Sequence, residues 1–423
     1  MTLKNSFCSS PWLHMRINNA GQYEYCRWRA KDSTVAESIH TQTPKEYFQK
    51  TMVPVRQEFL HGHMPNQCRE CAHQEQHSKV SGRQKQLLKI GVRLEQFEKT
   101  LASSPWIPEF SKQGQTDQLP QDWQIDLGNY CNGACVFCTP AYSSKLATEQ
   151  FKLKLISSLP PPNWTDDPVL VQRFIDTLIQ SPHIQYLHFI GGETLITPAF
   201  KTILQALIQA GLNRTATIGF TTNLSVWRED IVDLLCKFQG VNVGMSVETF
   251  TPINDYVRWP VGLSTVTENV ERWIQVSRQQ HWIMQFRTTP TCLTIKDLLT
   301  VYDYAWKHSI AVESCNFLSE PAHLRPSVLP HSYRTPIVEQ MRQWISARKT
   351  SNEQIVNIRD PNHAHQQIVQ DLESYVNYLE NEVDESHRLV DLVQYLKKLE
   401  SSRHNSIVDY LPEYEDLFRS AGY

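Results

Sequence analysis

The chain has 423 residues, of which 20% are charged and 40% hydrophobic, and its formal net charge is −3. This balance is that of an ordinary globular enzyme, and the charge excludes a non-specific hold on nucleic acid or on an anionic membrane. No apolar run approaches the ~18 residues of a membrane-spanning helix, and residues 1–8 lack the apolar core of a signal peptide, so we expect a cytoplasmic protein. Seven of the ten cysteines precede residue 140, which in a reducing compartment indicates metal or redox chemistry instead of disulfides.

Residues 1–85 form the first predicted unit. Residues 13–17 and 22–25 are typical of two short strands around an Asn/Gly turn, and the apolar spacing over 44–60 predicts a helix. Four cysteines of this unit make a complete set of thiolate ligands, which by chemistry alone could hold a structural zinc ion or a [4Fe–4S] cluster. They are Cys8, Cys26, Cys68 and Cys71.

Residues 86–119 are predicted to be a helix followed by an exposed polar linker, which places a domain boundary there. Over residues 120–320 short apolar strands alternate with helices, as in parallel βα units. The expected strands are 124–127, 186–190, 217–220, 241–247, 283–288 and 311–317. Cys236 lies in an apolar helical stretch and is expected in the core. Residues 321–423 are predicted to be mostly helical.

The first of these strands runs into a loop with three cysteines at C-x3-C-x2-C spacing, Cys131, Cys135 and Cys138. Three thiolates are one short of the four that hold a [4Fe–4S] cluster, so one iron could take a ligand from outside the protein. A zinc knuckle, or thiols buried as small apolar side chains, would also fit these three residues.

Polar residues follow the strands at the edge where parallel barrels place their catalytic groups. Gly191 and Gly192 let a ligand approach the backbone, and the carboxylate of Glu193 could pair with an ammonium group. Four more polar residues end the third and fourth strands, where they could contact a ligand or cap the helices that follow. They are Thr222, Asn223, Ser246 and Glu248.

The three-cysteine loop, with Gly-Gly-Glu about 55 residues after it, closely resembles the radical SAM superfamily, whose enzymes use S-adenosylmethionine (SAM). The resemblance implies an α/β fold with a partial (β/α)6 barrel, a helical C-terminal extension and a [4Fe–4S] cluster on the three cysteines. It also implies a set of contacts to SAM. These are Phe137, Gly191, Gly192, Glu193, Thr222, Asn223, Ser246, Glu248 and Arg258.

The first unit resembles the Twitch/SPASM auxiliary-cluster domain of radical SAM enzymes. The resemblance rests on the Cys-x-x-Pro-Trp start at Cys8, on the hairpin, and on the Cys-x-x-Cys pair followed by Ser81-Gly82-Arg83. It implies a small α+β domain with a second [4Fe–4S] cluster on the four cysteines of that unit. Structural zinc remains the alternative.

Taken together, the chain looks most like the peptide epimerases of the proteusin pathways, which convert L-residues to D-residues in ribosomally made precursor peptides. This resemblance implies abstraction of an α-hydrogen, then hydrogen donation by a thiol that ligates no cluster. Cys315 is the first candidate donor and Cys292 the second, and either could instead be a small core residue. The expected partners are a precursor peptide and an electron donor such as flavodoxin or ferredoxin.

Two other functions stay open at this stage. One is carbon–carbon or thioether crosslinking of a precursor peptide by the same radical chemistry. The other is a zinc-binding interaction protein without redox chemistry, which would explain the cysteines but not Gly-Gly-Glu or the strand–helix alternation.

Overall fold

The computed structural model describes residues 6–26, 37–76, 81–93, 96–104, 106–110, 112–314, 317–349 and 363–423. Within these residues one eight-stranded sheet has the order β2-β1-β3-β4-β5-β6-β7-β8, and every neighbouring pair is parallel except β1 with β2. The strands are β1 (His14–Ile17), β2 (Tyr23–Glu24), β3 (Asp122–Asp126), β4 (Tyr186–Ile190), β5 (Thr217–Thr222), β6 (Gly240–Ser246), β7 (Ile283–Arg287) and β8 (Ala311–Glu313). The predicted α/β class and its six parallel strands are confirmed.

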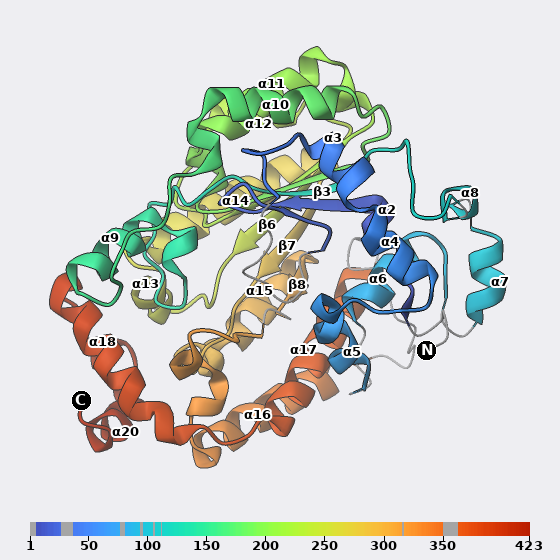
Figure 1. Ribbon diagram of the computed structural model, residues 1–423. Helices are drawn as coiled ribbons and strands as arrows, with labels where there is room; N and C mark the ends of the chain where they lie inside the picture. Colours follow the sequence, from blue (N-terminus) through green and yellow to red (C-terminus); the bar gives the residue numbers. More distant parts are fainter. Residues whose placement is uncertain are drawn as a thin grey trace.

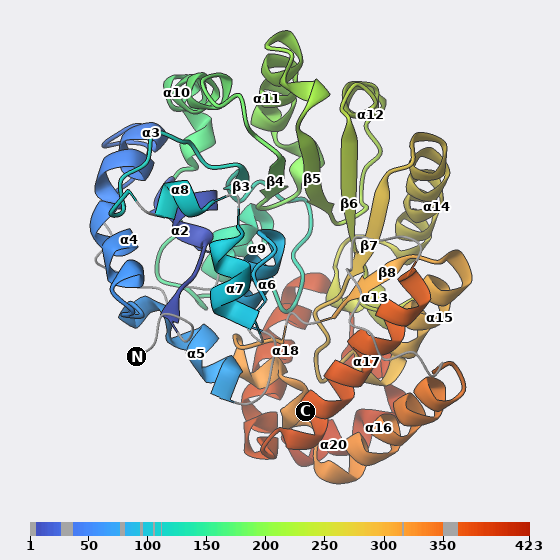
Figure 2. The same cartoon turned by 90° about the vertical axis from the view of Figure 1, so that its right-hand side faces the viewer.

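Five helices cover the outer face of this sheet, and Figure 2 shows them along the outside of the arc of strands. They are α10 (Pro168–Ile179), α11 (Pro198–Gln209), α12 (Glu229–Leu235), α14 (Leu263–Gln280) and α15 (Leu299–His308). Alternate strand residues point toward them because side chains in a strand alternate between faces. Trp123, Phe189 and Phe220 are among these residues, and each is fully buried. The apolar outer face is therefore the core of the barrel part.

The other face of the sheet is polar. On it, Arg287 Nη1 lies 3.1 Å from His188 Nε2 and donates to Thr221 Oγ1 at 3.1 Å. The Nε of Arg287 lies 3.4 Å from the Glu313 carboxylate. Gly219 leaves space for the polar side chains on this face of the sheet, since a Cβ on Gly219 would lie 2.1 Å from the Tyr186 hydroxyl. Charged and polar side chains from β4, β5, β7 and β8 thus meet inside the arc.

The N-terminal hairpin belongs to the same sheet, which the sequence did not indicate. Its strand β1 pairs in parallel with β3, with Arg16 opposite Gln124. Arg16 donates to Asp126 at 2.5 Å and to Glu24 at 2.9 Å, and the Asp126 side chain is fully buried. Part of the unit predicted at 1–85 therefore extends the sheet of the unit predicted at 120–320.

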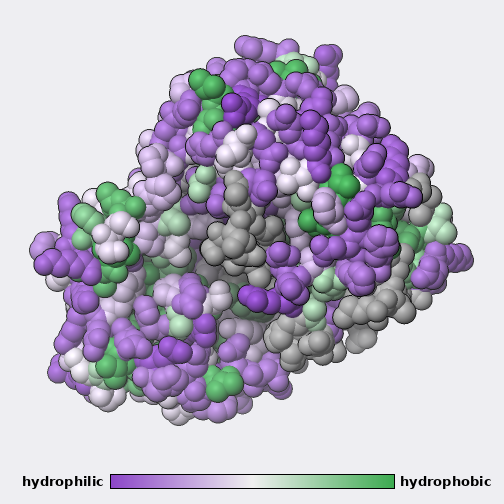
Figure 3. Space-filling model, in the orientation of Figure 1, coloured by the Kyte–Doolittle hydropathy of each residue, from purple (hydrophilic) through white to green (hydrophobic). Residues whose placement is uncertain are grey.

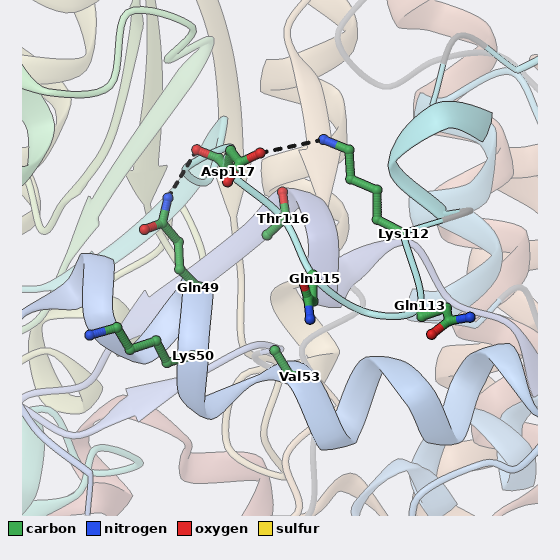
Figure 4. A pocket seen from close by; sticks show the side chains of 8 residues that line it. All are labelled: Gln49, Lys50, Val53, Lys112, Gln113, Gln115, Thr116 and Asp117. Carbon is green, nitrogen blue, oxygen red and sulfur yellow. Dashed lines mark hydrogen bonds and ion pairs between the residues drawn. The ribbon is translucent and has the colours of Figure 1, made fainter.

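The segment expected to be an exposed linker is partly buried against the N-terminal helices. Gly114 and Thr116 are buried, and the buried Arg56 donates to the Gly114 carbonyl at 3.2 Å. Gln49 donates to the Asp117 carbonyl at 2.9 Å, and Figure 4 shows the polar surface pocket between these two segments. The segment is therefore exposed only in part, because side chains of the N-terminal helices donate to two of its carbonyls. The helix predicted over 44–60 is present as α3 (Pro44–Glu46), the π-helical turn η1 (Tyr47–Thr51) and α4 (Val53–Leu60).

The predicted C-terminal extension is helical, and Figure 1 shows its helices below the sheet. They are α16 (His331–Ser346), α17 (Ala364–Asn381), α18 (Leu389–Arg403), α19 (Ile407–Tyr410) and α20 (Glu415–Ser420). Four leucines of α18 are buried, Leu389, Leu392, Leu396 and Leu399. No described helix has the length and apolarity needed to cross a membrane. The surface seen in Figure 3 is mostly hydrophilic, and it is hollowed between the helices at the top and those at the lower left.

Helix α17 closes the free edge of the sheet at β8. Gln367 accepts from the Val312 N–H at 3.0 Å and donates to the Val312 carbonyl, as a neighbouring strand would. One turn later Asp371 accepts from the Ser314 hydroxyl and from Tyr302, each at 2.6 Å. Burial raises the pKa of the Asp371 carboxyl to about 6. This carboxyl therefore keeps its proton to a higher pH in the folded protein than in the unfolded chain.

The raised pKa predicts a pH-dependent contribution of Asp371 to stability. A carboxyl whose folded-state pKa rises from 3.8 to about 6 stabilises the fold fully below about pH 4, and this contribution is lost as the pH rises through 6. Urea denaturation of wild type and Asp371→Asn measures it. The free energy of unfolding of wild type, relative to the variant, is expected to fall by up to about 3 kcal/mol between pH 4 and pH 7. An equal difference at both pH values would contradict the assignment.

Candidate functional site

The loop after β3 brings two of its three cysteines to one glycine. The sulfurs of Cys135 and Cys131 lie 3.7 Å and 3.8 Å from the position that a Cβ on Gly133 would take. Any side chain at Gly133 would therefore occupy the space beside both thiols. Cys135 is buried, whereas Cys131 and Cys138 are half-buried.

The electrostatics of these thiols indicate that they lie close together. Burial raises the pKa of Cys131 to about 12, and the next cause is the charge of Cys135. Burial also raises the pKa of Cys138, followed by the charges of Cys135 and Cys131. The protein alone therefore leaves all three protonated, and their conversion to thiolates needs a positive centre such as a metal.

The loop supplies three thiols as possible metal ligands. In the part of the chain that the structure describes, no three His, Cys, Asp or Glu side chains could hold one metal ion. A [4Fe–4S] cluster needs a wider spacing, because each thiolate binds a different iron. Cys131, Cys135 and Cys138 supply three of the four thiolate ligands of such a cluster.

Backbone contacts fix the shape of the cysteine loop. The Ala134 N–H donates to the Trp259 carbonyl at 2.7 Å, and the Val136 N–H donates to the Val257 carbonyl at 2.8 Å. Val257 ends α13 (Ile253–Val257), so the chain after β6 runs alongside the loop. The Ser143 hydroxyl, which follows the loop in sequence, also donates to the Gly133 carbonyl at 2.6 Å. The cysteines are thus held on a fixed backbone.

The Gly-Gly-Glu segment packs directly on this loop. Gly192 has a φ of +50°, and a Cβ on it would lie 2.0 Å from the Tyr130 carbonyl oxygen. The carboxylate of Glu193 is fully buried and accepts from the N–H groups of Leu195 at 3.1 Å and Asn223 at 2.5 Å. Burial raises its pKa to about 7. A carboxylate offers about four acceptor sites, so these backbone bonds leave capacity for an ammonium group.

The polar residues at the ends of β5 and β6 have different surroundings. Asn223 reaches the cysteine loop, where its Nδ2 lies 3.8 Å from the Cys131 sulfur and 3.0 Å from Asn132 Oδ1. Thr222 accepts from the Leu224 N–H at 3.0 Å, which is the local bonding expected of a turn residue. Ser246 ends β6 and is half-buried.

Three of the predicted SAM contacts converge. Arg258 pairs with Glu248, and its guanidinium carbon lies 5.4 Å from the centre of the Phe137 ring. Glu248 also accepts from the Thr289 N–H at 2.6 Å. The Nε of Arg258 is buried and has no hydrogen-bond partner among the described residues. An unpaired buried donor is costly, so Arg258 is suited to bind an anionic ligand group here.

The N-terminal cysteines form a second group. Burial raises the pKa of Cys8 to about 12, and the charges of Cys68 and Cys71 contribute to the rise. The Tyr25 hydroxyl, next to Cys26 in sequence, lies 3.4 Å from the Cys68 sulfur. The Cys71 sulfur accepts from the N–H groups of residues 82 and 83, at the start of α6 (Gly82–Lys89). The hairpin, the Cys-x-x-Cys pair and the Ser-Gly-Arg segment are therefore neighbours in space.

The remaining cysteines differ in exposure. Cys292 is fully buried, and its thiol donates to the His323 carbonyl at 3.9 Å. Cys236 is exposed, so its expected core position was wrong. It caps α12, which ends one residue earlier at Leu235. Cys315 lies outside the described residues, two positions after β8 ends at Glu313.

Sequence reasoning missed several residues that organise this site. Asp126 and Arg16 form a buried ion pair beside the loop, and Arg16 also donates to Tyr142 at 2.9 Å, just after the last cysteine. Arg403 and Tyr395 approach the loop from the C-terminal helix α18. A carboxylate at the end of β3, a few residues before the three-cysteine loop, was the available signal for Asp126. No local pattern marks Arg403 or Tyr395.

Comparison with known proteins supports the assignment of the domain. Residues 125–285 match the family model of the Radical SAM superfamily. No curated protein matches the sequence.

Several solved structures are similar at low sequence identity. Streptococcus suis SuiB bound to S-adenosylmethionine is 15% identical over 67% of this chain and 60% of SuiB, with a TM-score of 0.39. SuiB bound to the precursor peptide SuiA is 13% identical over 66% of this chain and 60% of SuiB, with a TM-score of 0.38. Native anSMEcpe with bound AdoMet is 17% identical over 53% of this chain and 60% of that chain, with a TM-score of 0.38. The chain therefore spans 60% of the length of the first of these structures.

The match to the family model covers the end of β3, the three-cysteine loop, the strand ends that carry Gly-Gly-Glu and Asn223, and Arg258 after α13. These are the elements that carry the candidate site. The candidate site therefore lies within residues 125–285, the part of the chain that matches the Radical SAM superfamily.

Proposed function

We propose that the chain epimerises residues of a ribosomally made precursor peptide from L to D, using SAM and a [4Fe–4S] cluster on Cys131, Cys135 and Cys138. The observation that carries the radical chemistry is the placement of the Cys131 and Cys135 thiols beside Gly133, with Asn223 next to Cys131. When bound and reduced, the cluster supplies the electron that cleaves SAM to methionine and a 5′-deoxyadenosyl radical.

The strand ends would bind the parts of SAM that need a polar partner. The unpaired Nε of Arg258 would donate to the carboxylate, with Glu248 and Phe137 holding the guanidinium in place. Glu193 would accept from the amino group. Thr222, Asn223 and Ser246 would serve the ribose, and Gly191 and Gly192 allow the backbone to approach the ligand.

The polar inner face of the sheet would receive the peptide. A peptide carries an N–H and a carbonyl in almost every residue, and these groups need hydrogen-bond partners when they leave water. Thr221 and Arg287 supply such groups from neighbouring strands. An apolar inner face would not offer them.

Epimerisation requires the hydrogen to leave from one face and return from the other. The α-hydrogen atom would move to the SAM-derived radical, giving 5′-deoxyadenosine. A thiol would then return a hydrogen atom to the α-carbon, and the sulfur radical would be restored by one electron and one proton. We assign the thiol to Cys315, with Cys292 as the second candidate.

The second group of cysteines would hold an auxiliary [4Fe–4S] cluster. Cys8, Cys26, Cys68 and Cys71 provide four thiolates, which leave no open iron for substrate. Full ligation suits a cluster that passes electrons between the active site and a donor such as flavodoxin or ferredoxin. It argues against a mechanism in which the substrate binds that cluster.

The reaction in deuterium oxide with a candidate precursor peptide tests the proposed function. We expect one deuterium at the α-carbon of each converted residue, detected by mass spectrometry, and D-residues after hydrolysis. Cys315→Ala is expected to abolish D-residue formation while 5′-deoxyadenosine is still produced, because the thiol acts after hydrogen abstraction.

Two results would contradict parts of this proposal. If Cys315→Ala and Cys292→Ala both leave D-residue formation intact, the thiol donor is assigned to the wrong residue. A product two mass units lighter, without deuterium, would instead show carbon–carbon or thioether crosslinking. The match to the radical SAM family favours either reaction over a zinc-binding interaction protein without redox chemistry.

A further inference from the structure

The C-terminal helix α18 contacts the backbone of the three-cysteine loop, although more than 250 residues separate them in sequence. Tyr395 donates its hydroxyl hydrogen to the Val136 carbonyl at 2.9 Å. Arg403 donates from Nη2 to the Ala134 carbonyl at 2.7 Å. Ala134 and Val136 stand on either side of Cys135, and both are fully buried. Figure 1 shows α18 below α13 and α9 (Ser144–Lys152). Of these two helices, α9 comes directly after the loop in sequence.

These two bonds complete the bonding of the loop backbone around Cys135. The N–H groups of Ala134 and Val136 already donate to the carbonyls of Trp259 and Val257. With the bonds from α18, each of the two residues has both its N–H and its carbonyl paired. The segment is therefore held from two sides, by residues 257–259 and by α18.

Both side chains of α18 are themselves fixed. The Arg403 side chain is 1% exposed, pairs with Glu149 of α9 at 2.6 Å, and lies over the Trp259 ring with its guanidinium carbon 5.0 Å from the ring centre. The Tyr395 hydroxyl accepts from Gln150 of α9 at 3.3 Å. Arg403 therefore acts on the loop through a directed hydrogen bond to Ala134, and its charge, although paired with Glu149, also acts to lower the pKa of Cys135 against the effect of burial.

We propose that Tyr395 and Arg403 are positioning residues that hold Cys135 in place for the cluster on the three-cysteine loop. The inference rests on the proposed function, because it takes the loop to be the cluster site. It adds that the C-terminal extension, outside the matched residues 125–285, is needed for that site. A loop that loses one of these bonds leaves a buried carbonyl unpaired and opens more often.

The test compares two variants with two matched controls. Tyr395→Phe removes only the hydroxyl that donates to the Val136 carbonyl. Arg403→Met removes the guanidinium that donates to the Ala134 carbonyl. Tyr423→Phe is the control for the first, because its hydroxyl donates to Glu400 at 2.9 Å and not to the loop. Arg388→Met is the control for the second, because this arginine precedes α18 and donates to Glu385 at 3.0 Å.

Two readouts are measured on each protein. In the cluster-free protein, iodoacetamide labelling followed by peptide mass spectrometry gives the rate at which Cys135 is alkylated, with the exposed Cys236 as internal reference. We expect this rate to rise about tenfold in both variants and to stay unchanged in both controls. In the reconstituted protein, the change that SAM causes in the electron paramagnetic resonance signal of the reduced cluster is expected to weaken in the variants only.

Equal Cys135 labelling in variants, controls and wild type would overturn the inference. If Arg403→Met does not fold, Tyr395→Phe alone decides, because it removes a single oxygen atom. A wild-type protein that gains no SAM-responsive signal would refute the proposed function instead. The labelling contrast between Tyr395→Phe and Tyr423→Phe does not depend on that signal, so the two failures are distinguishable.

Discussion

Replacing Arg16 with methionine is expected to lower the free energy of unfolding by about 3–5 kcal/mol, because it leaves the carboxylate of Asp126 buried without its counterion. The Asp126 side chain has no exposed surface and that of Arg16 is 11% exposed. Arg16 donates twice to Asp126, at 2.5 Å and 3.3 Å, and once to Glu24 at 2.9 Å. Urea denaturation of the cluster-free protein measures the loss.

An exposed arginine provides the control. Arg228 pairs with Asp230 at 2.8 Å, and their side chains are 40% and 39% exposed. Arg228→Met is expected to cost less than about 1 kcal/mol, because water screens exposed ion pairs. The double variant Arg16→Met, Asp126→Asn is expected to recover part of the loss by removing the unpaired charge. Equal losses for Arg16→Met and Arg228→Met would show that the buried pair does not join the hairpin to the barrel.

The Arg16 contacts matter because they link three parts of the chain. One part is the hairpin that leads to Cys26, another is β3, which leads to the cysteine loop, and the third is Tyr142 after that loop. Arg16 therefore fixes the hairpin that leads to Cys26 relative to the three-cysteine loop. A lost ion pair here is expected to affect both cysteine groups, not only stability.

The barrel was predictable from sequence because its signals are local. Each strand from β3 to β8 is a short stretch with apolar residues at alternate positions and is followed by a helix, and the observed strands start and end within a few residues of the expected ones. The cysteine spacing and Gly-Gly-Glu are also contiguous motifs. Burial and side-chain alternation in such runs depend only on neighbouring residues.

The pairing of β1 with β3 was not predictable, because nothing within residues 14–17 specifies a partner more than 100 positions away. The same limit applies to Tyr395 and Arg403, which reach the loop from the other end of the chain. It also applies to residues 112–117, whose polar composition suggested exposure. There the carbonyls, and not the side chains, carry the contacts to Arg56 and Gln49.

Cys138→Ala is expected to remove about four of about eight iron ions per chain, and to end SAM cleavage to 5′-deoxyadenosine. The loop then keeps two thiolates, too few to hold a [4Fe–4S] cluster that leaves one iron free for SAM. Cys68→Ala is expected to remove the other four while the SAM-induced change in the resonance signal remains, because Cys68 belongs to the N-terminal group.

Anaerobic iron and sulfide analysis after reconstitution checks both variants, with Cys236→Ala as control. Cys236 is exposed and lies at the end of α12, away from both cysteine groups in sequence, so its loss is expected to change neither iron content nor SAM cleavage. If Cys138→Ala keeps all its iron, the three-cysteine loop does not hold the cluster. If the wild-type protein binds zinc and no iron, both cysteine groups are structural metal sites. The pairing of Cys138→Ala with Cys68→Ala separates these outcomes, because only a two-cluster protein loses a different half of its iron in each.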